Sequence, residues 1–474
     1  MNYGKLTPAI LESLKQIAGA GFVFTDPETM RQYGHDETED LNFPPHAVVK
    51  PRTAEEISAV LKLCNREKIP VTPRGAGTGL SGGALPVYGG VLLSMERFNA
   101  ILDIDENNLQ ATVEPGVINE VFGNAAAARG LYYPPDPASK GSCFLGGNIA
   151  ENSGGPKAVK YGVTKDYVLN LEVVLPTGEI IWTGANVLKN STGYNLTQLM
   201  TGSEGTLGII TKIVFRLTSL PKQNMLMLVP FHSALEACEA VSSIFRAGVT
   251  PSALEFLEKD AIDWAMKYAD TSLVNKQLLE ISRRNDIEAH LLIEVDGNDT
   301  EVLIKDCERI AGVIDKFKTA DTLFADTAEQ KNSLWKMRRS VGEAVKSHSV
   351  YKEEDTVVPR AELPKLLAGV KELGRRYGFH SVCYGHAGDG NLHVNIIKAG
   401  MSDEDWKNRI PLAIREIFKL CVSLHGTLSG EHGIGWVQKD YMDIAFPEIT
   451  RSIQKQIKAV FDPNGILNPG KIWS

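Results

Sequence analysis

Short apolar runs alternate with amphipathic stretches from about residue 45 to residue 219. Val48 and Val49 end at Pro51, and Thr53 followed by Glu56 has the spacing of a helix capping box, with Thr53 accepting and Glu56 reaching back. The amphipathic stretch after it extends to about Arg66. Further apolar runs predict strands at 69–72, 91–94, 110–113, 171–175 and 208–215. This part of the chain is therefore predicted to mix strands and helices.

The pattern changes near Leu220-Pro221. Beyond it, apolar runs at 225–231, 290–295 and 380–384 alternate with helical stretches at 234–246 and 363–377. This order predicts an antiparallel sheet with helices on one face. The sequence after residue 420 is helical and ends in a turn at 462–465. We expect an α+β protein with domains at 1–219 and 220–419 and a C-terminal helical segment, 420–474, packing back on the first domain.

Composition narrows the class of protein. The 474 residues carry a net charge of −8 without a basic block, which argues against nucleic acid as a partner. The six cysteines form no CxxC pair, which argues against a disulfide scaffold, an iron–sulfur cluster and a zinc ribbon. The first residues lack a secretory signal, and no apolar run approaches the roughly 18–20 residues of a membrane span. A cytoplasmic location is expected, with peripheral membrane docking and a homodimer both left open.

The first glycine-rich loop reads Gly77-Thr78-Gly79-Leu80-Ser81-Gly82. It has the literal G-x-G-x-x-G spacing, but a Rossmann motif requires these glycines to open a helix. The residues that follow, 83–90, include Pro86 and two adjacent glycines and cannot continue a helix. What the loop retains is backbone N–H groups that can converge on an anion, with Arg74 nearby to add charge.

Two further glycine clusters lie at 141–155 and 202–208. Three such loops beside predicted strands suit a long cofactor that lies against backbone. Together with Tyr133-Pro134 and Tyr161-Gly162, these segments resemble the FAD-binding domain of the p-cresol methylhydroxylase and vanillyl-alcohol oxidase family. They are most similar to its branch of glycolate oxidase flavin subunits, D-lactate dehydrogenases and D-2-hydroxyglutarate dehydrogenases, and the resemblance extends from about residue 45 to the end.

The resemblance implies a two-subdomain FAD-binding domain at 1–219 and a substrate, or cap, domain at 220–419. It places the pyrophosphate and ribityl groups of FAD against 74–79 and 142–155, and adenine or flavin against residues at 134, 162, 208 and 209. The FAD-binding residues it implies are Arg74, Gly75, Ala76, Gly77, Thr78, Gly79, Pro134, Gly141, Ser142, Gly146, Gly147, Asn148, Ser153, Gly154, Gly155, Gly162, Glu204, Gly208 and Ile209. Members that tether FAD through histidine carry it at the position of Thr78, so non-covalent FAD is predicted here.

A histidine pair is the strongest chemical signal in the second half of the chain. His386 and His393 flank Asp389-Gly390, a sequence that favours a two-residue hairpin turn. Such a turn would set the two histidines directly opposite one another, close enough to bind one ion, with Asn395 on the same face. Two surface histidines on a plain hairpin are the alternative.

A second glycine-rich context, Ser429-Gly430-Glu431-His432-Gly433, adds a carboxylate and a third imidazole. By resemblance, His386, His393 and Glu431 are metal ligands and His432 is the catalytic base. Two histidines and one carboxylate favour zinc with open positions for substrate, and leave manganese and iron as alternatives.

The substrate carboxylate requires a cation. Trp335-Lys336-Met337-Arg338 resembles the W-x-x-R segment of the family, which makes Arg338 the candidate carboxylate fork. Lys352 falls near another substrate-binding lysine of the family, and Asn395 is a third candidate. A solvated surface charge is the alternative for each cation. The family threonine after that arginine is Gly342 here, which weakens the case for a longer dicarboxylate substrate.

The expected activity is FAD-dependent oxidation of a short D-2-hydroxy acid, D-lactate or glycolate. Deprotonation at the metal and hydride transfer to flavin N5 would give the 2-oxo acid. Alternatives are a D-2-hydroxyglutarate dehydrogenase, a carbon–oxygen transferase like alkyl-glycerone phosphate synthases, and a non-catalytic flavin-binding subunit. Electrons must leave for an external acceptor, such as electron-transfer flavoprotein, a quinone or an iron–sulfur subunit.

Overall fold

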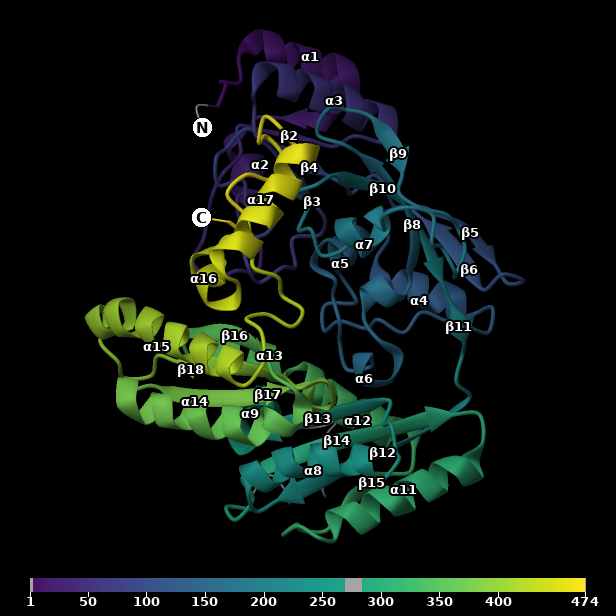
Figure 1. The fold of residues 1–474 in the computed structure, drawn as a ribbon, viewed down its shortest axis with the longest axis vertical. Coiled ribbons are helices and arrows are strands. Elements are labelled where there is room, and N and C mark those ends of the chain that lie inside the picture. The colour runs from purple at the N-terminus through teal and green to yellow at the C-terminus, as the bar shows by residue number, and fades with distance from the viewer. Residues whose placement is uncertain (1–2, 269–283, 474) are drawn as a thin grey trace. The chain divides into compact units, whose positions relative to one another are not determined.

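The computed structural model describes residues 3–268 and 284–473, and the chain divides into two compact units (Figure 1). Unit 1 contains residues 1–154, 163–220 and 431–474, and unit 2 contains residues 155–162 and 221–430. The first division falls one residue from the boundary expected at 219/220. The second falls at 430/431 instead of 419/420, because the helix that ends at Ser423 belongs to unit 2.

The first sheet of unit 1 has the strand order β1-β2-β4-β3, in which β2, β4 and β3 run parallel. Its strands are β1 (Val23–Phe24), β2 (Ala47–Val49), β3 (Val71–Arg74) and β4 (Val91–Ser94). The helices before and beside it are α1 (Pro8–Ala18), α2 (Pro27–Gln32) and α3 (Ala54–Glu67). Leu14, Ile57 and Leu61 from α1 and α3 share one buried core with Val71 and Leu93.

Helix α3 begins at the predicted cap. The Thr53 hydroxyl accepts from the N–H of Glu56 at 3.2 Å. The Glu56 carboxylate reaches back to the N–H of Arg52 at 2.7 Å, one residue further than the capping box predicts.

The second sheet of unit 1 is antiparallel throughout, in the order β5-β6-β10-β8-β9. Its strands are β5 (Ile101–Asp105), β6 (Gln110–Val113), β8 (Val168–Val174), β9 (Ile180–Trp182) and β10 (Ile209–Arg216). The other elements of this part are α4 (Asn119–Ala127), α5 (Leu145–Glu151), α7 (Leu196–Met200) and the pair β7 (Leu131–Tyr132) with β11 (Thr218–Ser219). The segment after Gly82 forms no helix, which confirms that the first glycine loop is not a Rossmann motif.

The C-terminal segment returns to the first sheet. After α16 (Met442–Ala445) and α17 (Glu448–Phe461), Leu467 forms a parallel bridge with Val71. The N–H of Val71 donates to Ile466 at 2.8 Å, and the N–H of Asn468 donates to Val71 at 2.7 Å. Residues from the two ends of unit 1 thus share one sheet edge.

Unit 2 is built on a seven-stranded antiparallel sheet in the order β15-β12-β14-β13-β17-β18-β16. Its strands are β12 (Gln223–Phe231), β13 (Ala253–Glu258), β14 (Ala289–Gly297), β15 (Leu323–Ala325), β16 (Tyr351–Val357), β17 (His380–Gly385) and β18 (Asn391–Ile397). Its helices are α6 (Ala158–Tyr161), α8 (Ala234–Arg246), α9 (Lys259–Tyr268), α11 (Thr300–Ile314), α12 (Ala328–Arg339), α13 (Val341–His348), α14 (Leu363–Tyr377) and α15 (Asp403–Ser423).

Helices cover both faces of this sheet, so the expectation of helices on one face is wrong. Helices α9, α12 and α13 pack on the face that carries Leu257, Leu292 and Tyr384. Leu291 and Ile293 point to the other face and are equally buried, and α8 and α11 contact their strand. Strand β14 is accordingly buried on both faces, from Ala289 to Asp296.

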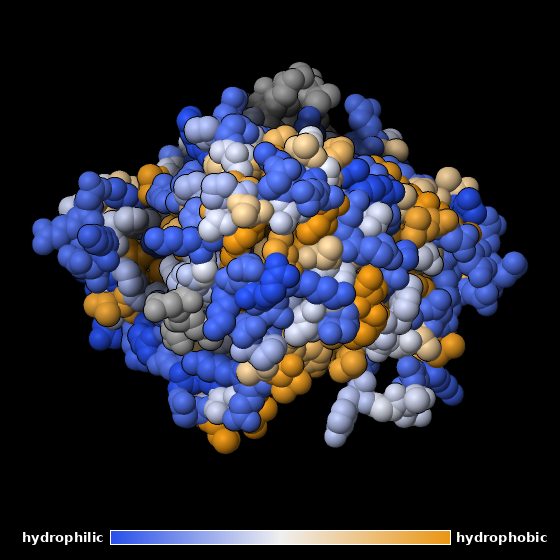
Figure 2. Space-filling view, turned by 90° about the horizontal axis from the view of Figure 1, so that it is seen from above, coloured by the Kyte–Doolittle hydropathy of each residue, from blue (hydrophilic) through white to orange (hydrophobic). Residues whose placement is uncertain are grey.

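Hydrophilic side chains cover most of the face shown in Figure 2, with hydrophobic ones in smaller groups between them. Such scattered apolar residues are normal on a globular surface. None of the helices in the described ranges combines the length and apolar character that crossing a membrane requires.

Candidate active site

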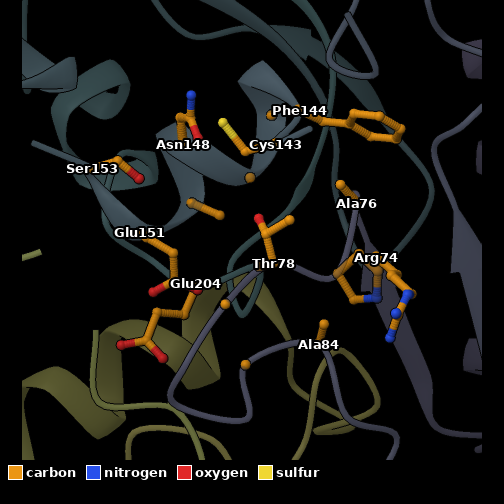
Figure 3. A pocket seen from close by; sticks show the side chains of 18 of the residues that line it. Arg74, Ala76, Thr78, Ala84, Cys143, Phe144, Asn148, Glu151, Ser153 and Glu204 are labelled. Atoms are coloured by element: carbon orange, nitrogen blue, oxygen red, sulfur yellow. The ribbon is translucent and has the colours of Figure 1, made fainter. Parts of the chain in front are cut away.

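A pocket in unit 1 is formed by three glycine-rich segments: the loop after β3, the start of α5, and the turn before β10 (Figure 3). The predicted FAD-binding residues that line it are Arg74, Gly75, Ala76, Gly77, Thr78, Gly79, Gly146, Gly147, Asn148, Ser153, Glu204, Gly208 and Ile209. Pro134, Gly141, Ser142 and Gly154 do not line it, and Gly155 and Gly162 belong to unit 2. Distant loops therefore meet around one cavity.

The pocket wall carries the features of a phosphate cradle. Gly77 has φ +77°, and a Cβ there would lie 2.1 Å from a guanidinium nitrogen of Arg74, so the backbone must approach this buried arginine closely. At Gly147 a Cβ would meet no atom within 4 Å, so the wall is open there. The Asn148 side-chain nitrogen is buried without a hydrogen-bond partner among the described residues. A bound ligand with acceptor oxygens fits this donor.

Two carboxyl groups, Glu151 and Glu204, point toward one another at one end of the pocket (Figure 3). Both come within about 3 Å of the point that a Cβ at Gly433 would occupy. Glu204 accepts from the N–H groups of Ile434 at 2.8 Å and Gly435 at 2.6 Å. Burial raises the pKa of Glu151 well above its ordinary value, and the charge of Glu204 adds to the effect.

The loop from Ser429 to Gly435 crosses from unit 2 into unit 1 between Gly430 and Glu431. Glu431 and His432 both line the pocket of unit 1. The Glu431 carboxylate accepts from the N–H of Gly154 at 3.1 Å, and the His432 carbonyl accepts from the Ser81 hydroxyl at 2.8 Å. The candidate metal-binding carboxylate and the candidate base therefore border the pocket that the glycine loops form.

The candidate histidines of unit 2 lie close together, although their predicted register is wrong. His393 pairs with Tyr384, not with His386. The strands are joined through a short 3-10 turn at 387–389, closed by Gly390 at φ +79°, instead of a two-residue turn. His386 is the first residue after β17, and its ring centroid lies 5.6 Å from that of His393 at an interplanar angle of 81°. Both histidines are buried.

Each of the two imidazoles has a carboxylate near its Nδ1 atom. His386 Nδ1 lies 2.9 Å from each carboxylate oxygen of Glu255, which is fully buried on β13. His393 Nδ1 lies 3.3 Å from Glu353 and 3.6 Å from Asp355. Burial by itself would raise the pKa of Glu255, but His386 and Arg338 outweigh it and lower that pKa.

Arg338 is buried in unit 2, but it is not an open fork. Its Nε and Nη2 donate to Glu255 at 2.7 and 2.6 Å. Its remaining terminal nitrogen, Nη1, has no hydrogen-bond partner among the residues that the structure describes. With Nε and Nη2 bound to Glu255, Nη1 is the edge of Arg338 that faces no protein acceptor in the described residues, and the role of Arg338 as carboxylate fork stays a prediction.

The other two substrate candidates lie on opposite faces of the sheet. Asn395 is fully buried and pairs with Glu353, on the His393 face as predicted. Lys352 is exposed and alternates with Glu353 along β16, so it points away from that face. Asn395 therefore lies on the same face of the sheet as His393, whereas Lys352 lies on the opposite face. The neighbour of Lys352 on β16 that lies on the His393 face is the carboxylate Glu353.

Three residues of these sites carry little signal in the sequence. Glu255 is one of two carboxylates in the otherwise apolar strand Ala253–Glu258, and a charge inside an apolar run is the local hint. Glu151 ends a helix between predicted cofactor residues. Asn468 lines the pocket from the far end of the chain and has no motif around it.

The pocket and the fold around it define an FAD-binding protein with a second, antiparallel-sheet domain. The chain belongs to the FAD-linked oxidases: residues 220–472 match the family described as "FAD linked oxidases, C-terminal domain", and residues 45–184 match "FAD binding domain". This confirms the resemblance stated from the sequence and makes the protein an FAD-linked oxidoreductase.

Three curated relatives are similar over nearly the whole chain. A D-lactate dehydrogenase of Anaerostipes hadrus is 39% identical over 472 residues, covering 99% of this chain and 98% of that protein. The glycolate oxidase subunit GlcD of Bacillus subtilis is 38% identical, covering 99% and 97%. A D-2-hydroxyglutarate dehydrogenase of Stutzerimonas stutzeri is 32% identical, covering 98% and 99%.

Solved structures confirm the fold class. p-Cresol methylhydroxylase superposes with a TM-score of 0.80 at 19% identity, covering 98% of this chain and 96% of that one. An alkyldihydroxyacetonephosphate synthase superposes with a TM-score of 0.77 at 20% identity, covering 99% and 87%. At these identities the likeness concerns the fold alone.

Proposed function

We propose that this protein oxidises a short D-2-hydroxy acid, D-lactate or glycolate, to the corresponding 2-oxo acid, with FAD as hydride acceptor. The observation that carries the proposal is the loop 429–432. Its carboxylate and imidazole, at Glu431 and His432, border the pocket of unit 1, and the residue before them is anchored in unit 2 beside the histidine pair. Relatives named D-lactate dehydrogenase and glycolate oxidase subunit support the substrate class.

FAD is held without a covalent bond in this proposal. Thr78 stands in the pocket where a tethering histidine would stand in the resemblance (Figure 3). A threonine hydroxyl does not form such a link under ordinary conditions, and the backbone-lined walls at Gly77 and Gly147 provide affinity instead. When bound, FAD supplies the hydride acceptor that the oxidation requires.

His386, His393 and Glu431 are proposed to hold a divalent metal, with zinc favoured. The Glu255 carboxylate at Nδ1 of His386 directs the opposite ring nitrogen, Nε2, toward a ligand. Chain connectivity supports the third ligand. The Gly430 N–H donates to Asp355 at 2.8 Å, and Asp355 pairs with His393 across the strands. Glu431 therefore directly follows a residue that is fixed beside His393. When bound, the metal lowers the pKa of the substrate hydroxyl.

His432 is proposed as the base that accepts the hydroxyl proton, because an imidazole titrates near neutral pH. Its backbone is held by Ser81, and Gly433 at φ +77° permits the sharp turn that follows it. Arg338 Nη1 and Asn395 are proposed to orient the substrate carboxylate.

A short monocarboxylate fits this site better than a dicarboxylate. The Glu353 carboxylate, largely buried beside His393, would repel a second substrate carboxylate. Gly342 adjoins Tyr384, since a Cβ there would lie 3.4 Å from the tyrosine hydroxyl, and it offers no side-chain donor. D-2-Hydroxyglutarate is the second candidate, because a relative bears that name at 32% identity.

Electrons must then leave FAD for an external acceptor, for which electron-transfer flavoprotein, a quinone or an iron–sulfur subunit is proposed. All six cysteines are buried and unpaired. They are spread along the chain without the spacing that holds an iron–sulfur cluster, so the acceptor is expected to be another molecule.

Anaerobic titration tests the proposal. The purified protein should contain flavin, and D-lactate or glycolate should bleach its absorbance, whereas L-lactate should not. A His386→Ala/His393→Ala variant should lose metal and bleaching but keep FAD. His380→Ala, which alters an exposed histidine of the same unit, should keep all three. Failure of every 2-hydroxy acid to bleach the flavin would refute the oxidation.

A further inference from the structure

A buried chain of three charged or titratable groups, Arg338, Glu255 and His386, lies on one face of the unit 2 sheet. Glu255 is 0% exposed and Arg338 is 6% exposed. The Glu255 carboxylate receives Nε and Nη2 of Arg338 at 2.7 and 2.6 Å. The same carboxylate lies 2.9 Å from His386 Nδ1 through both of its oxygens.

A carboxylate at Nδ1 determines which ring nitrogen carries the proton. A carboxylate only accepts hydrogen bonds, so Nδ1 must be protonated to bond with it. The other nitrogen, Nε2, then has a lone pair directed away from Glu255. A histidine that binds a metal needs this arrangement, and a carboxylate partner also raises its basicity as a ligand.

Arg338 explains how Glu255 can be ionised inside the protein. An isolated carboxylate is costly to bury, but an arginine in a two-donor contact offsets most of that cost. Arg338 itself is positioned by α12 and stacks over the Tyr384 ring at 5.1 Å. The guanidinium therefore holds the carboxylate in one place relative to His386.

The Nδ1 atom of the second histidine has longer carboxylate contacts. His393 Nδ1 is 3.3 Å from Glu353 and 3.6 Å from Asp355, outside the usual range of a strong hydrogen bond. The Glu255 carboxylate, by contrast, lies at bonding distance from His386 Nδ1 and is itself bound by Arg338. The two imidazoles are thus expected to contribute differently to a metal site.

We propose that Glu255, clamped by Arg338, is a positioning residue that keeps His386 protonated at Nδ1 and presents Nε2 to a divalent cation. This inference rests on the proposed metal site. It assigns Arg338 a role besides contact with substrate, and it identifies in Glu255 a residue that no motif marks.

The test compares Glu255→Gln with a matched variant, Glu294→Gln, in the full-length protein. Glu294 is 2% exposed on the neighbouring strand β14 and binds Lys157 and Trp335 without touching a histidine. Both substitutions remove a buried ion pair from the same sheet. Only the first removes the partner of His386, so loss of stability alone cannot imitate the expected result.

Zn²⁺ affinity is measured by competition with a chromophoric chelator, and FAD content is measured by absorbance. Glu255→Gln should weaken Zn²⁺ binding by roughly ten- to a hundredfold, the usual effect of removing such a partner, and leave FAD content unchanged. Glu294→Gln should bind Zn²⁺ like the wild type. Equal Zn²⁺ affinity in Glu255→Gln and the wild type would overturn the inference and leave the proposed metal site intact. A wild type that binds no Zn²⁺ would overturn both.

A second measurement does not depend on the Glu255 variant. In metal-free wild-type protein labelled with ¹⁵N-histidine, long-range ¹H–¹⁵N spectra distinguish the two imidazole tautomers. The His386 signal, identified by its absence from His386→Gln, should show the proton on Nδ1. A proton mainly on Nε2 would overturn the inference whatever the metal affinity.

Discussion

His290 is a histidine that the fold buries without a hydrogen bond. It lies on β14 between Pro230 and Leu257, is 1% exposed, and neither ring nitrogen has a partner among the described residues. Burial, with a smaller contribution from Lys259, lowers its pKa from 6.5 to about 3. Replacement by leucine should therefore change how the stability of unit 2 depends on pH.

The sign and size follow from proton linkage. Between pH 6.5 and 3 the unfolded state binds a proton at His290 that the folded state does not, so stability is lost as pH falls through this window. Each pH unit within the window corresponds to about 1.4 kcal/mol, so the drop from pH 6.5 to 5 costs about 2 kcal/mol. Leucine does not titrate. The His290→Leu variant should thus gain about 2 kcal/mol over the wild type between pH 7 and 5.

Urea unfolding at pH 7, 6 and 5, followed by hydrogen exchange in peptides covering β14, measures this difference locally. Other groups titrate equally in both proteins and cancel in the comparison. His290→Gln serves as a control, because it keeps a polar side chain but cannot be protonated, and should show the same change in slope. A stability difference between His290→Leu and wild type that stays constant from pH 7 to 5 would refute the reasoning.

Three shorter predictions concern the two sites. Denaturation in acid should release all the flavin into the supernatant, since Thr78 forms no tether; flavin that stays with the precipitated chain would contradict this. Gly390→Ala should destabilise unit 2 by about 1–3 kcal/mol or more, because φ is +79° and a Cβ would lie 1.9 Å from the Val358 carbonyl oxygen. Gly400→Ala is the control: a Cβ there would meet no atom within 4 Å, so this variant should have the Tm of the wild type. Glu204→Gln should lose FAD during gel filtration at pH 7, because Glu204 accepts from two backbone N–H groups through its two oxygens and one of these contacts loses its acceptor. Glu151→Gln should retain FAD, because one carboxylate oxygen of Glu151 has no hydrogen-bond partner among the described residues; equal retention in the two variants would contradict this difference.

The short apolar runs were sufficient to predict several strands. The run at 91–94 is β4, and the run at 110–113 is β6, with the same bounds. Helices α8 and α14 also begin and end where periodicity predicts. Local features of the sequence identify these elements: helix-capping residues and the change in spacing of apolar residues between strands and helices. Their prediction therefore needed no information about tertiary contacts.

The histidine hairpin shows where local patterns stop being sufficient. Asp389-Gly390 favours a two-residue turn, but the backbone makes a 3-10 turn first, and the register moves by two positions. Because the shift is even, His393 keeps its face, and the pair still meets. Lys352 and Glu353 are neighbours on β16, and neighbouring residues of a strand point to opposite faces of the sheet. A difference of one position is therefore enough to put Lys352 on the face away from His393.

Glu255 could not be assigned from sequence for a different reason. It lies 131 residues from His386 along the chain, and only the strand order places β13 beside β17. Likewise Asn468 reaches the pocket through the bridge between Leu467 and Val71. Such partners depend on topology, and one sequence does not specify which distant strands become neighbours.

The return of residues 466–468 to β3 sets an order of events during synthesis. A ribosome makes the whole of unit 2 before it makes the segment that completes the first sheet of unit 1. Unit 2 can therefore fold before Val71 forms its bridge with Leu467. Because this bridge closes a long loop of chain, it is expected to form slowly. The nascent chain should acquire its flavin only after Asn468 has left the exit tunnel. Until then the glycine loops lack flavin, so the flavin available after synthesis, and not during it, should govern how much protein survives proteolysis.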